Sequence, residues 1–482
     1  LFLPDNLEEE QVQDFRSQWV ARLIYLGIHL HQHEPARREI ETRYRQLGEN
    51  ERIGEDCLVW RSQKGIGTYD YECPGTKFLI TDIPTWGVGA DMRLGVVPTL
   101  LAGLAMNRTV VLVNGASKSV NASYIKEDWK LSGCDDRKDY QCFFLPLSPC
   151  VPSLDDLKNA VVLTSTKDTL QAHKRGAFEN DIYNNAKVVI MPSYAKLTVM
   201  DSEAEGRALK RIQELIQEQV EKRTLEVPVS LVHGLTNNSN LMLQQQREKK
   251  GEKYDFSSSI MNAAALMYIF RLNSNFKDQV DSAVRRAVPS DFLTENSFGM
   301  PIRASDKCGV ESVCLPFEKY MELVSQQRKK YFEPNENNRT LNIVLTSESP
   351  NIMEARKAFE NRTDFPYRFV VNKEDSLQGS GWPKQYGEAK AKNDIMVSTF
   401  VALKLQLLSK HFVANCCSRF HEVMMDLFKN GCGAAPSPSI HCMQELEDEQ
   451  FQLCCDHTGT PKCRKQLFVY RKYLEEHGNV HF

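Results

Sequence analysis

The sequence predicts an α/β fold with two lobes. Short apolar runs bounded by Gly and Pro alternate with helical patterns, which is typical of buried parallel strands joined by helices. The 482 residues are long enough for two or three domains, and no internal repeat is visible. We therefore expect successive α/β lobes rather than a repeat array.

The chain is expected to begin with a helical stem, residues 1–54. Apolar residues recur at helical spacing from Val12 to Leu30, and Asp5 is placed to cap the helix. Pro35 is expected to break the helix into two pieces.

Residues 55–295 are expected to form an N-terminal α/β lobe. Its predicted strands are 77–80, 109–113, 161–163 and 188–191, and its predicted helices are 97–106, 204–222 and 259–271.

The alternation is clearest in residues 296–432, which we expect to form a Rossmann-like lobe. Its predicted strands are 341–345, 367–371 and 411–415, and its predicted helices are 352–360, 395–409 and 419–428. Residues 433–482 show no clear period, and we expect them to pack as a Cys-rich tail tied by disulfides.

Charge and hydropathy exclude some classes of partner. The 60 Lys and Arg residues nearly cancel the 63 Asp and Glu residues, so no overall positive field would attract nucleic acid. The longest apolar runs, 96–106 and 259–272, are shorter than the ~20 residues that cross a bilayer. Because the first residue is Leu1, a preceding signal peptide or membrane anchor is compatible with the sequence.

Cysteine usage and glycosylation patterns favour a lumenal or extracellular protein. Many of the 14 cysteines cluster in short stretches, as in disulfide-bonded proteins. Zinc binding is less favoured, because the tail contains no C-x₂-C pair. The N-x-S/T pattern occurs at Asn107, Asn121, Asn237, Asn338 and Asn361.

A candidate reaction centre lies in the segment from Pro301 to Glu311. An arginine binds a diphosphate in bidentate geometry, so Arg303 is the candidate clamp. Glu311 is a candidate base for an acceptor hydroxyl, and Lys307 lies between the two residues, where it could tune the proton affinity of the carboxylate. A surface cluster of ion pairs would explain the same residues.

The run IRASDKCGVESVCLPFEKYM resembles the α1,6-fucosyltransferases, the family of core N-glycan and nodulation fucosyltransferases. The spacing of its arginine, lysine and glutamate and the following P-x-E-x-Y-M pattern carry this resemblance. The resemblance implies that Arg303 binds the donor diphosphate, that Glu311 is the catalytic base and that Lys307 assists it.

Three further stretches resemble the same family. LNIVLTSESPNIMEARKAF implies donor-binding roles for Ser347 and Glu348 at a strand end, and KHFVANCCSRFHEVMMDLF implies one for Ser418 at a helix start. The glycine loop Gly87-Val88-Gly89 resembles the family's loop under the donor, where the backbone approaches the diphosphate.

The resemblance implies a GT-B-like enzyme of the Golgi or secretory lumen. It would transfer fucose from GDP-fucose to a glycan or glycoprotein, with inversion, without a cofactor and without a metal. The absence of a D-x-D triplet agrees with metal independence. The N-terminal helix resembles the stem helices that mediate dimerisation in the family, although a helix packed on its own domain explains the pattern equally well.

The sequence also departs from the family pattern. Pro301 stands where the family has a histidine, Ala304 where it has a second arginine, and an aspartate that binds the ribose is missing near Ala402. Two alternatives therefore stay open: the same fold with another nucleotide sugar, and a catalytically silent extracellular binding or structural protein.

Overall fold

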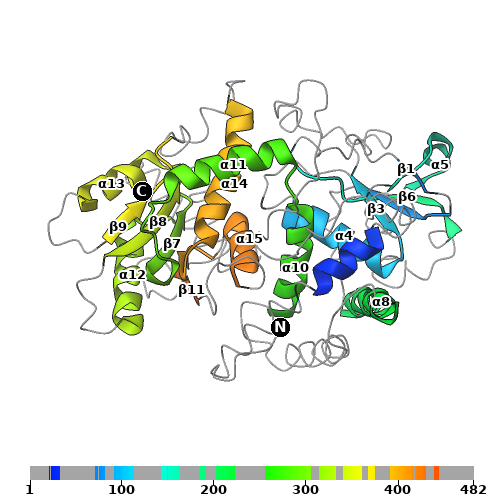
Figure 1. The fold of residues 1–482 in the computed structure, drawn as a ribbon, viewed down its shortest axis with the longest axis horizontal. Helices are drawn as coiled ribbons and strands as arrows, with labels where there is room; N and C mark the ends of the chain where they lie inside the picture. The colour runs from blue at the N-terminus through cyan, green and yellow to red at the C-terminus, as the bar shows by residue number, and fades with distance from the viewer. Residues whose placement is uncertain are drawn as a thin grey trace, which may run out of the picture. The chain divides into compact units, whose positions relative to one another are not determined.

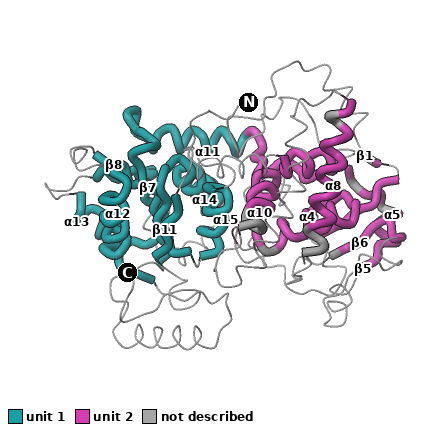
Figure 2. Tube along the Cα trace, turned by 90° about the horizontal axis from the view of Figure 1, so that it is seen from below, with its two compact units in different colours: residues 1–15, 275–482 teal, residues 16–274 magenta. Residues whose placement is uncertain are grey.

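The computed structural model divides the chain into two compact units (Figure 2). Unit 1 comprises residues 275–482 with residues 1–15, and unit 2 comprises residues 16–274. The structure describes residues 21, 23–32, 71–73, 75–81, 89, 92–112, 143–148, 150–162, 185–191, 202–222, 256–304, 314–332, 340–360, 367–374, 391–416, 418–429 and 439–443.

Unit 1 is built on a five-stranded sheet in which every strand pair is parallel (Figure 1). The strands run in the order β11-β10-β7-β8-β9 across the sheet. In chain order they are β7 (Ser297–Ile302), β8 (Leu341–Ser347), β9 (Tyr367–Val370), β10 (His411–Ala414) and β11 (Ser439–Cys442). Read from the β9 edge this is the order 3-2-1-4-5 of a dinucleotide-binding fold, so the predicted α/β class with a Rossmann-like lobe is confirmed.

Helices cover both faces of this sheet (Figure 1). On one face, α12 (Phe317–Tyr331) and α13 (Pro350–Glu360) share a hydrophobic core with β7 and β8 that includes Phe317 and Phe298. The opposite face carries α14 (Ala391–Leu407) and α15 (Arg419–Leu427). Burial on both faces explains why these strands read as nearly continuous apolar runs.

Helix α14 is anchored to the sheet by a buried glutamine. Gln406 Nε2 donates to the carbonyl oxygen of Val344 and to the hydroxyl of Thr346, both at 2.9 Å. A Cβ atom added at Gly299 in β7 would lie 2.6 Å from Gln406 Oε1, so this approach requires glycine at that position.

Unit 2 contains a second parallel sheet, in the order β3-β2-β6-β5. Its strands are β2 (Phe78–Thr81), β3 (Thr109–Leu112), β5 (Val161–Val162) and β6 (Val188–Met191). A π-helical segment (Met92–Val96), α4 (Val97–Ala105), α5 (Leu154–Lys158), α8 (Ser202–Glu221) and α10 (Phe256–Ile269) make up its labelled helical elements.

Two buried arginines in unit 2 act as structural clamps. Arg108 donates to the carbonyl oxygens of Phe78 and Ala186, which lie next to the amino ends of β2 and β6. Arg271 donates to the carbonyl oxygen of Pro146 and lies 3.8 Å from the centre of the Tyr268 ring. The two guanidinium groups therefore bind backbone carbonyl oxygens and, for Arg271, an aromatic ring, which is a structural role.

The described part of the stem helix, residues 23–32, is packed into unit 2. A Cβ atom added at Gly27 would collide with Ile212 of α8, so the two helices lie close together. Gln32 Oε1 accepts a hydrogen bond of 2.9 Å from the backbone N–H of Val110 in the edge strand β3. For these residues the structure agrees with a helix packed on its own domain, and a homodimer stays a prediction.

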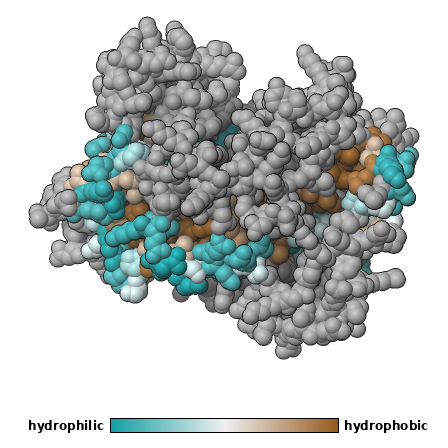
Figure 3. All heavy atoms as spheres, turned by 90° about the horizontal axis from the view of Figure 1, so that it is seen from above, coloured by the Kyte–Doolittle hydropathy of each residue, from teal (hydrophilic) through white to brown (hydrophobic). Residues whose placement is uncertain are grey.

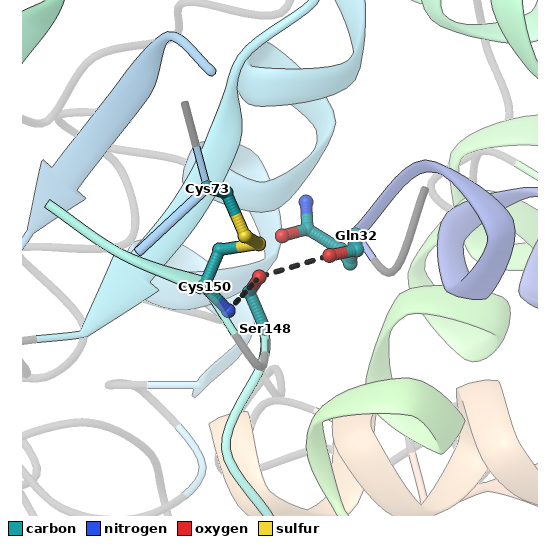
Figure 4. The surroundings of a disulfide bond; sticks show 4 residues. All are labelled: Gln32, Cys73, Ser148 and Cys150. Atoms are coloured by element: carbon teal, nitrogen blue, oxygen red, sulfur yellow. Dashed lines mark hydrogen bonds between the residues drawn. A yellow bond between two sulfur atoms is a disulfide. The ribbon is translucent and has the colours of Figure 1, made fainter. Parts of the chain in front are cut away.

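A disulfide lies beside this contact (Figure 4). Cys73 and Cys150 join β1 (Tyr71–Glu72) to β4 (Cys150–Val151), a separate parallel pair. Ser148 Oγ donates to the backbone oxygen of Gln32 at 2.9 Å and accepts from the N–H of Cys150 at 3.1 Å. The expected oxidation of the cysteines is therefore observed, and the disulfide, the stem helix and β4 form one connected assembly.

The predicted strands and helices agree with described elements to within a few residues. The structure adds elements that no pattern predicted, among them the central strand β7, and it differs from the predictions in two further places. Helix α11 (Ser274–Ala287) falls in unit 1 apart from its first residue, although we placed it in the 55–295 lobe. Its Phe276 packs edge-on against Phe400, and its Asp281 pairs with Lys404 of α14 at 2.5 Å, which explains its place.

The second difference concerns the tail. Residues 439–442 form strand β11 of the unit 1 sheet, paired with β10, although we expected the tail to be an appendix tied by disulfides and predicted no strand there. The disulfide expected there is present, between Cys416 and Cys442. The assignment of the stem and the tail as separate domains stays a prediction.

The surface of the described residues is mostly polar. On the face shown in Figure 3, hydrophilic side chains lie outermost, and hydrophobic ones show between and behind them. Among the described large hydrophobic residues, Leu293 and Tyr331 are the exposed ones, at 59% and 40%.

Candidate functional site

The strand order of unit 1 defines where a ligand would bind. The chain leaves β7 toward one edge of the sheet, through β8 and β9, and later returns to the other side of β7 as β10 and β11. In open α/β sheets, ligands bind outside the carboxyl ends of the two strands where the order reverses. Here those strands are β7 and β10, which pair directly.

Arg303 follows directly from the last residue of β7 at this point. Its Nε lies 3.5 Å from Oε1 of Glu348, which follows the last residue of β8. The two residues come together because Ile302 pairs with Ser347 in the parallel register. The Arg303 side chain is 26% exposed, so solvent or a ligand reaches part of it while Glu348 helps to hold it.

The serines after β8 build the turn into α13. Ser347 Oγ accepts from the N–H of Ser349 at 3.1 Å, and Ser349 Oγ accepts from the N–H of Ile352 at 3.5 Å. These bonds satisfy backbone groups at the start of a helix. Ser347 therefore shapes the edge beside Glu348, whereas we expected it to bind the donor; that role stays a prediction.

The turn between β10 and α15 is closed by one carbonyl. The backbone oxygen of Asn415 accepts from the N–H of Ser418 at 3.3 Å and is 2.8 Å from Nδ1 of His421. Within the same turn Cys416 forms a disulfide with Cys442, the last residue of β11. Hydrogen bonds and a disulfide thus fix the loop that enters α15.

Ser418 is the N-cap residue of α15, but its side chain does not cap the helix. The residue is 8% exposed, and its hydroxyl has no hydrogen-bond partner among the described residues. The hydroxyl can therefore donate to a ligand. The hydroxyl and the backbone N–H groups of the first turn, with the positive end of the helix dipole, together suit a phosphate.

His421, in the first turn of α15, completes the group. Burial lowers the pKa of His421 to about 4, the hydrogen bond with Asn415 opposes this shift, and the charge of Arg303 adds to it. The imidazole is therefore neutral at pH 7. We did not predict a role for His421, although its position three residues after Ser418 on a helix that follows a strand was visible in the sequence.

The structure brings together only part of the predicted site. Arg303 and Glu348 are in contact, and Ser418 lies after the neighbouring strand at the same edge. Lys307, Glu311, Gly87 and Val88 lie outside the described residues. Gly89 is described, and it is buried and helical.

Of the five glycosylation patterns, only Asn107 is among the described residues. It lies exposed in the turn after α4 with a φ of 51°, and its side chain hydrogen-bonds His31. Thr109 of the same pattern is buried in β3. A glycan on Asn107 would have to share or replace the bond to His31; glycosylation stays a prediction for this residue and for Asn121, Asn237, Asn338 and Asn361, which lie outside the described residues.

The described part of the chain contains no group of three His, Cys, Asp or Glu side chains placed to hold a metal. Nor does any helix within the described ranges have the length and apolar character of a membrane span. The disulfides fit an oxidising compartment.

Comparison with known proteins gives only distant similarities. No family model and no curated protein sequence matches the chain. A mutant of Arabidopsis thaliana FUT1 in complex with GDP is 12% identical, with a TM-score of 0.38, and the match covers 88% of this chain and 79% of FUT1. POFUT1 in complex with GDP-fucose is 10% identical, with a TM-score of 0.36, and the match covers 76% of this chain and 97% of POFUT1. These scores are too low to assign a family or a ligand.

Proposed function

We propose that this protein is a glycosyltransferase that binds the diphosphate of a nucleotide sugar at the carboxyl edge of the unit 1 sheet. The observation that carries the proposal is that Arg303 and the Ser418 turn follow β7 and β10, the two paired strands at which the strand order reverses. These groups are hydrogen-bond donors of the kind that bind phosphate oxygens. The proposed donor is GDP-fucose, and the proposed acceptor is a hydroxyl group of a glycan or glycoprotein.

The proposed reaction inverts the sugar carbon and uses protein groups in place of a metal. The carboxylate of Glu311 takes the proton from the acceptor hydroxyl, whose oxygen attacks the sugar carbon as the bond to the diphosphate breaks on the opposite face. Arg303 and the first turn of α15 stabilise the charge on the leaving diphosphate. Lys307 assists Glu311, and Gly87, Val88 and Gly89 complete the donor site.

The proposed location is the Golgi or another part of the secretory pathway, or outside the cell. The disulfides Cys73–Cys150 and Cys416–Cys442 support an oxidising compartment. Homodimerisation through the N-terminal helices belongs to the same proposal, although residues 23–32 pack within unit 2.

Binding of the nucleotide is the first experiment. GDP should raise the melting temperature of the protein, because a ligand that binds only the folded form stabilises it. Arg303→Ala should weaken GDP binding roughly 10- to 100-fold, since it removes charge-assisted hydrogen bonds worth about 1.5–3 kcal/mol. Lys410→Ala is the matched control, because Lys410 is a cation at the opposite edge of the same sheet, paired with Glu295 at 3.1 Å.

Transfer of the sugar is the second experiment. Glu311→Gln should abolish transfer from GDP-fucose and leave GDP affinity unchanged, because the base acts on the acceptor rather than on the nucleotide. Full transfer by this variant would overturn the mechanism. A panel of nucleotide sugars tests the alternative that the same fold uses another donor.

One observation favours a second candidate, a catalytically silent binding or structural protein. Glu348, a carboxylate with a largely buried side chain, lies beside Arg303, and its charge opposes a diphosphate there. This candidate predicts that neither GDP nor any nucleotide sugar changes the melting temperature.

A further inference from the structure

His421 is oriented by a single hydrogen bond. Its Nδ1 lies 2.8 Å from the backbone oxygen of Asn415, and a carbonyl oxygen can only accept. Nδ1 must therefore carry the ring proton. Because a neutral imidazole has one N–H group, Nε2 carries a lone pair and is an acceptor.

The Nε2 atom has no hydrogen-bond partner among the described residues. It lies on the side of the ring away from Nδ1 and thus points away from the Asn415 carbonyl. The residue is 3% exposed, and Nε2 is not one of the fully buried unpartnered atoms, so a ligand can reach it. The charge of Arg303 acts on the His421 ring, so Nε2 lies near the proposed ligand site.

Electrostatics keep this acceptor available. Arg303 is the charged group that acts on His421 within the described part of the chain, and its positive charge disfavours protonation of the ring. The phosphate-binding groups nearby, Arg303, the Ser418 hydroxyl and the backbone N–H groups of α15, are all donors. The diphosphate of a nucleotide sugar is fully ionised at pH 7 and has no proton to give to Nε2, so a different part of that ligand must supply the donor.

We propose that His421 is a specificity-determining residue whose Nε2 accepts a hydrogen bond from a hydroxyl or N–H group on the nucleoside half of the bound nucleotide. The proposal rests on the proposed function, because it requires the diphosphate to bind beside Arg303 and Ser418. It adds a contact that distinguishes a nucleotide from a bare diphosphate.

Two substitutions separate the two nitrogens of His421. In His421→Asn, the side-chain amide can still donate to the Asn415 carbonyl, but the acceptor is lost. In His421→Gln, the longer side chain can place an acceptor oxygen near the position of Nε2, while the bond to Asn415 is lost. Both variants should be checked for an unchanged fold by circular dichroism before binding is measured.

The test compares GDP with inorganic diphosphate by calorimetric titration. His421→Asn should weaken GDP binding about 10-fold or more and leave diphosphate binding within about twofold, because a ligand donor facing a lost partner is penalised. His421→Gln should retain more of the GDP affinity than His421→Asn does. The ratio of the two affinities is a readout that loosening of the turn would not change.

Nucleotide analogues identify the donor group. The 2′-deoxy and 3′-deoxy forms of GDP each lack one ribose hydroxyl, and ADP lacks the N1–H and 2-amino donors of guanine. The analogue that lacks the contacted donor should bind the wild type more weakly than GDP and should bind His421→Asn as well as GDP does. If none of the analogues behaves in this way, the proposal is wrong.

Other outcomes also overturn the proposal. Unchanged GDP affinity in His421→Asn means that Nε2 makes no contact, and equal losses for GDP and diphosphate mean that His421 only supports the turn. In both cases the proposed function stands, because wild-type binding is intact. Binding of neither ligand by the wild type would instead refute the proposed function, and this inference with it.

Discussion

The two ends of strand β10 both carry buried polar side chains, but they differ in how these side chains are partnered. At the amino end, His411 Nδ1 lies 2.6 Å from Ser439 Oγ, which lies 3.0 Å from His441 Nε2. The His411 ring is stacked between Phe298 and Tyr331, with ring centres 4.8 and 4.5 Å away. The Ser439 hydroxyl thus links the two histidine rings within the protein.

At the carboxyl end, the turn from Asn415 to His421 leaves polar atoms without such partners. The Ser418 hydroxyl and His421 Nε2 have none among the described residues, and Arg303 lies nearby. A histidine at each end has a lowered pKa, about 3 for His411 and about 4 for His421. A shifted pKa therefore does not by itself distinguish a site from a structural cluster, whereas position at the strand-order reversal does.

The largest expected effect comes from removing the His411 ring from the cluster at the amino end of β10. His411→Ala should lower the free energy of unfolding of unit 1 by about 4 kcal/mol, because a ring stacked on both faces is replaced by a cavity. GDP affinity, measured well below the melting temperature, should not change. A large loss of affinity in this folded variant would show that the two ends of β10 are not independent.

The next effect comes from removing the disulfide at the carboxyl end. Replacing both Cys416 and Cys442 by Ala should cost about 3 kcal/mol, since the bond closes a loop of 26 residues, and should weaken GDP binding because the Ser418 turn is no longer tied to β11. The matched control replaces Cys73 and Cys150, which close a longer loop of 77 residues in unit 2. The control should cost about 4 kcal/mol and leave GDP affinity unchanged.

Acid should act on the amino-end cluster in a measurable way. Burial first, and then the charges of His441 and Lys410, lower the pKa of His411 to about 3 from 6.5. Below pH 6.5 His411 is protonated in the unfolded chain but stays neutral in the native state. The free energy of unfolding therefore decreases as the pH falls from about 6.5 toward 3. At pH 5 this loss is about 2 kcal/mol for His411.

His411→Phe keeps the stacking but removes the titration. Its stability should therefore fall less than that of the wild type between pH 7 and pH 5, as measured by chemical denaturation at each pH. Equal acid sensitivity of the two proteins would contradict burial of a neutral His411 as the cause of the loss. His29 and His31 in unit 2, with pKa values lowered to about 3 chiefly by burial, should keep their own contribution in both proteins.

Much of the fold was predictable from the sequence, because local pattern determines most of it. The apolar runs that became β2, β3, β6, β8 and β10 could be recognised from local composition, whereas β7, which contains Gly299 and Pro301, was not predicted as a strand. Strand β11 was missed because four residues, Ser439 to Cys442, contain only one aliphatic side chain, and their pairing with β10 is a tertiary contact. Helix α11 packs against Phe400, which lies far away in sequence, so its place in unit 1 could not be predicted from local pattern.

Residues of the candidate site could be predicted only where they belong to a sequence motif with recognisable spacing. Arg303 and Ser418 could be named from the sequence, but the contact of Arg303 with Glu348 depends on the register of β7 with β8. The role of His421 depends on which nitrogen bonds to Asn415, and no sequence pattern fixes that choice. Pairing and hydrogen-bond direction are properties of the folded chain.

The smallest expected effect tests the two hydrogen bonds of Ser439 at the amino end of β10. Ser439→Ala removes the hydroxyl that joins His411 to His441 and leaves a nitrogen on each ring without its partner, so stability should fall by about 1 kcal/mol. Ser439→Thr keeps a hydroxyl in an edge strand that tolerates a β-branched residue, and it should recover most of the loss. Both values follow from urea denaturation at pH 7. If Ser439→Ala is as stable as the wild type, the hydroxyl is not needed by the two rings, and the contrast between the two ends of β10 rests on the stacking of His411 alone.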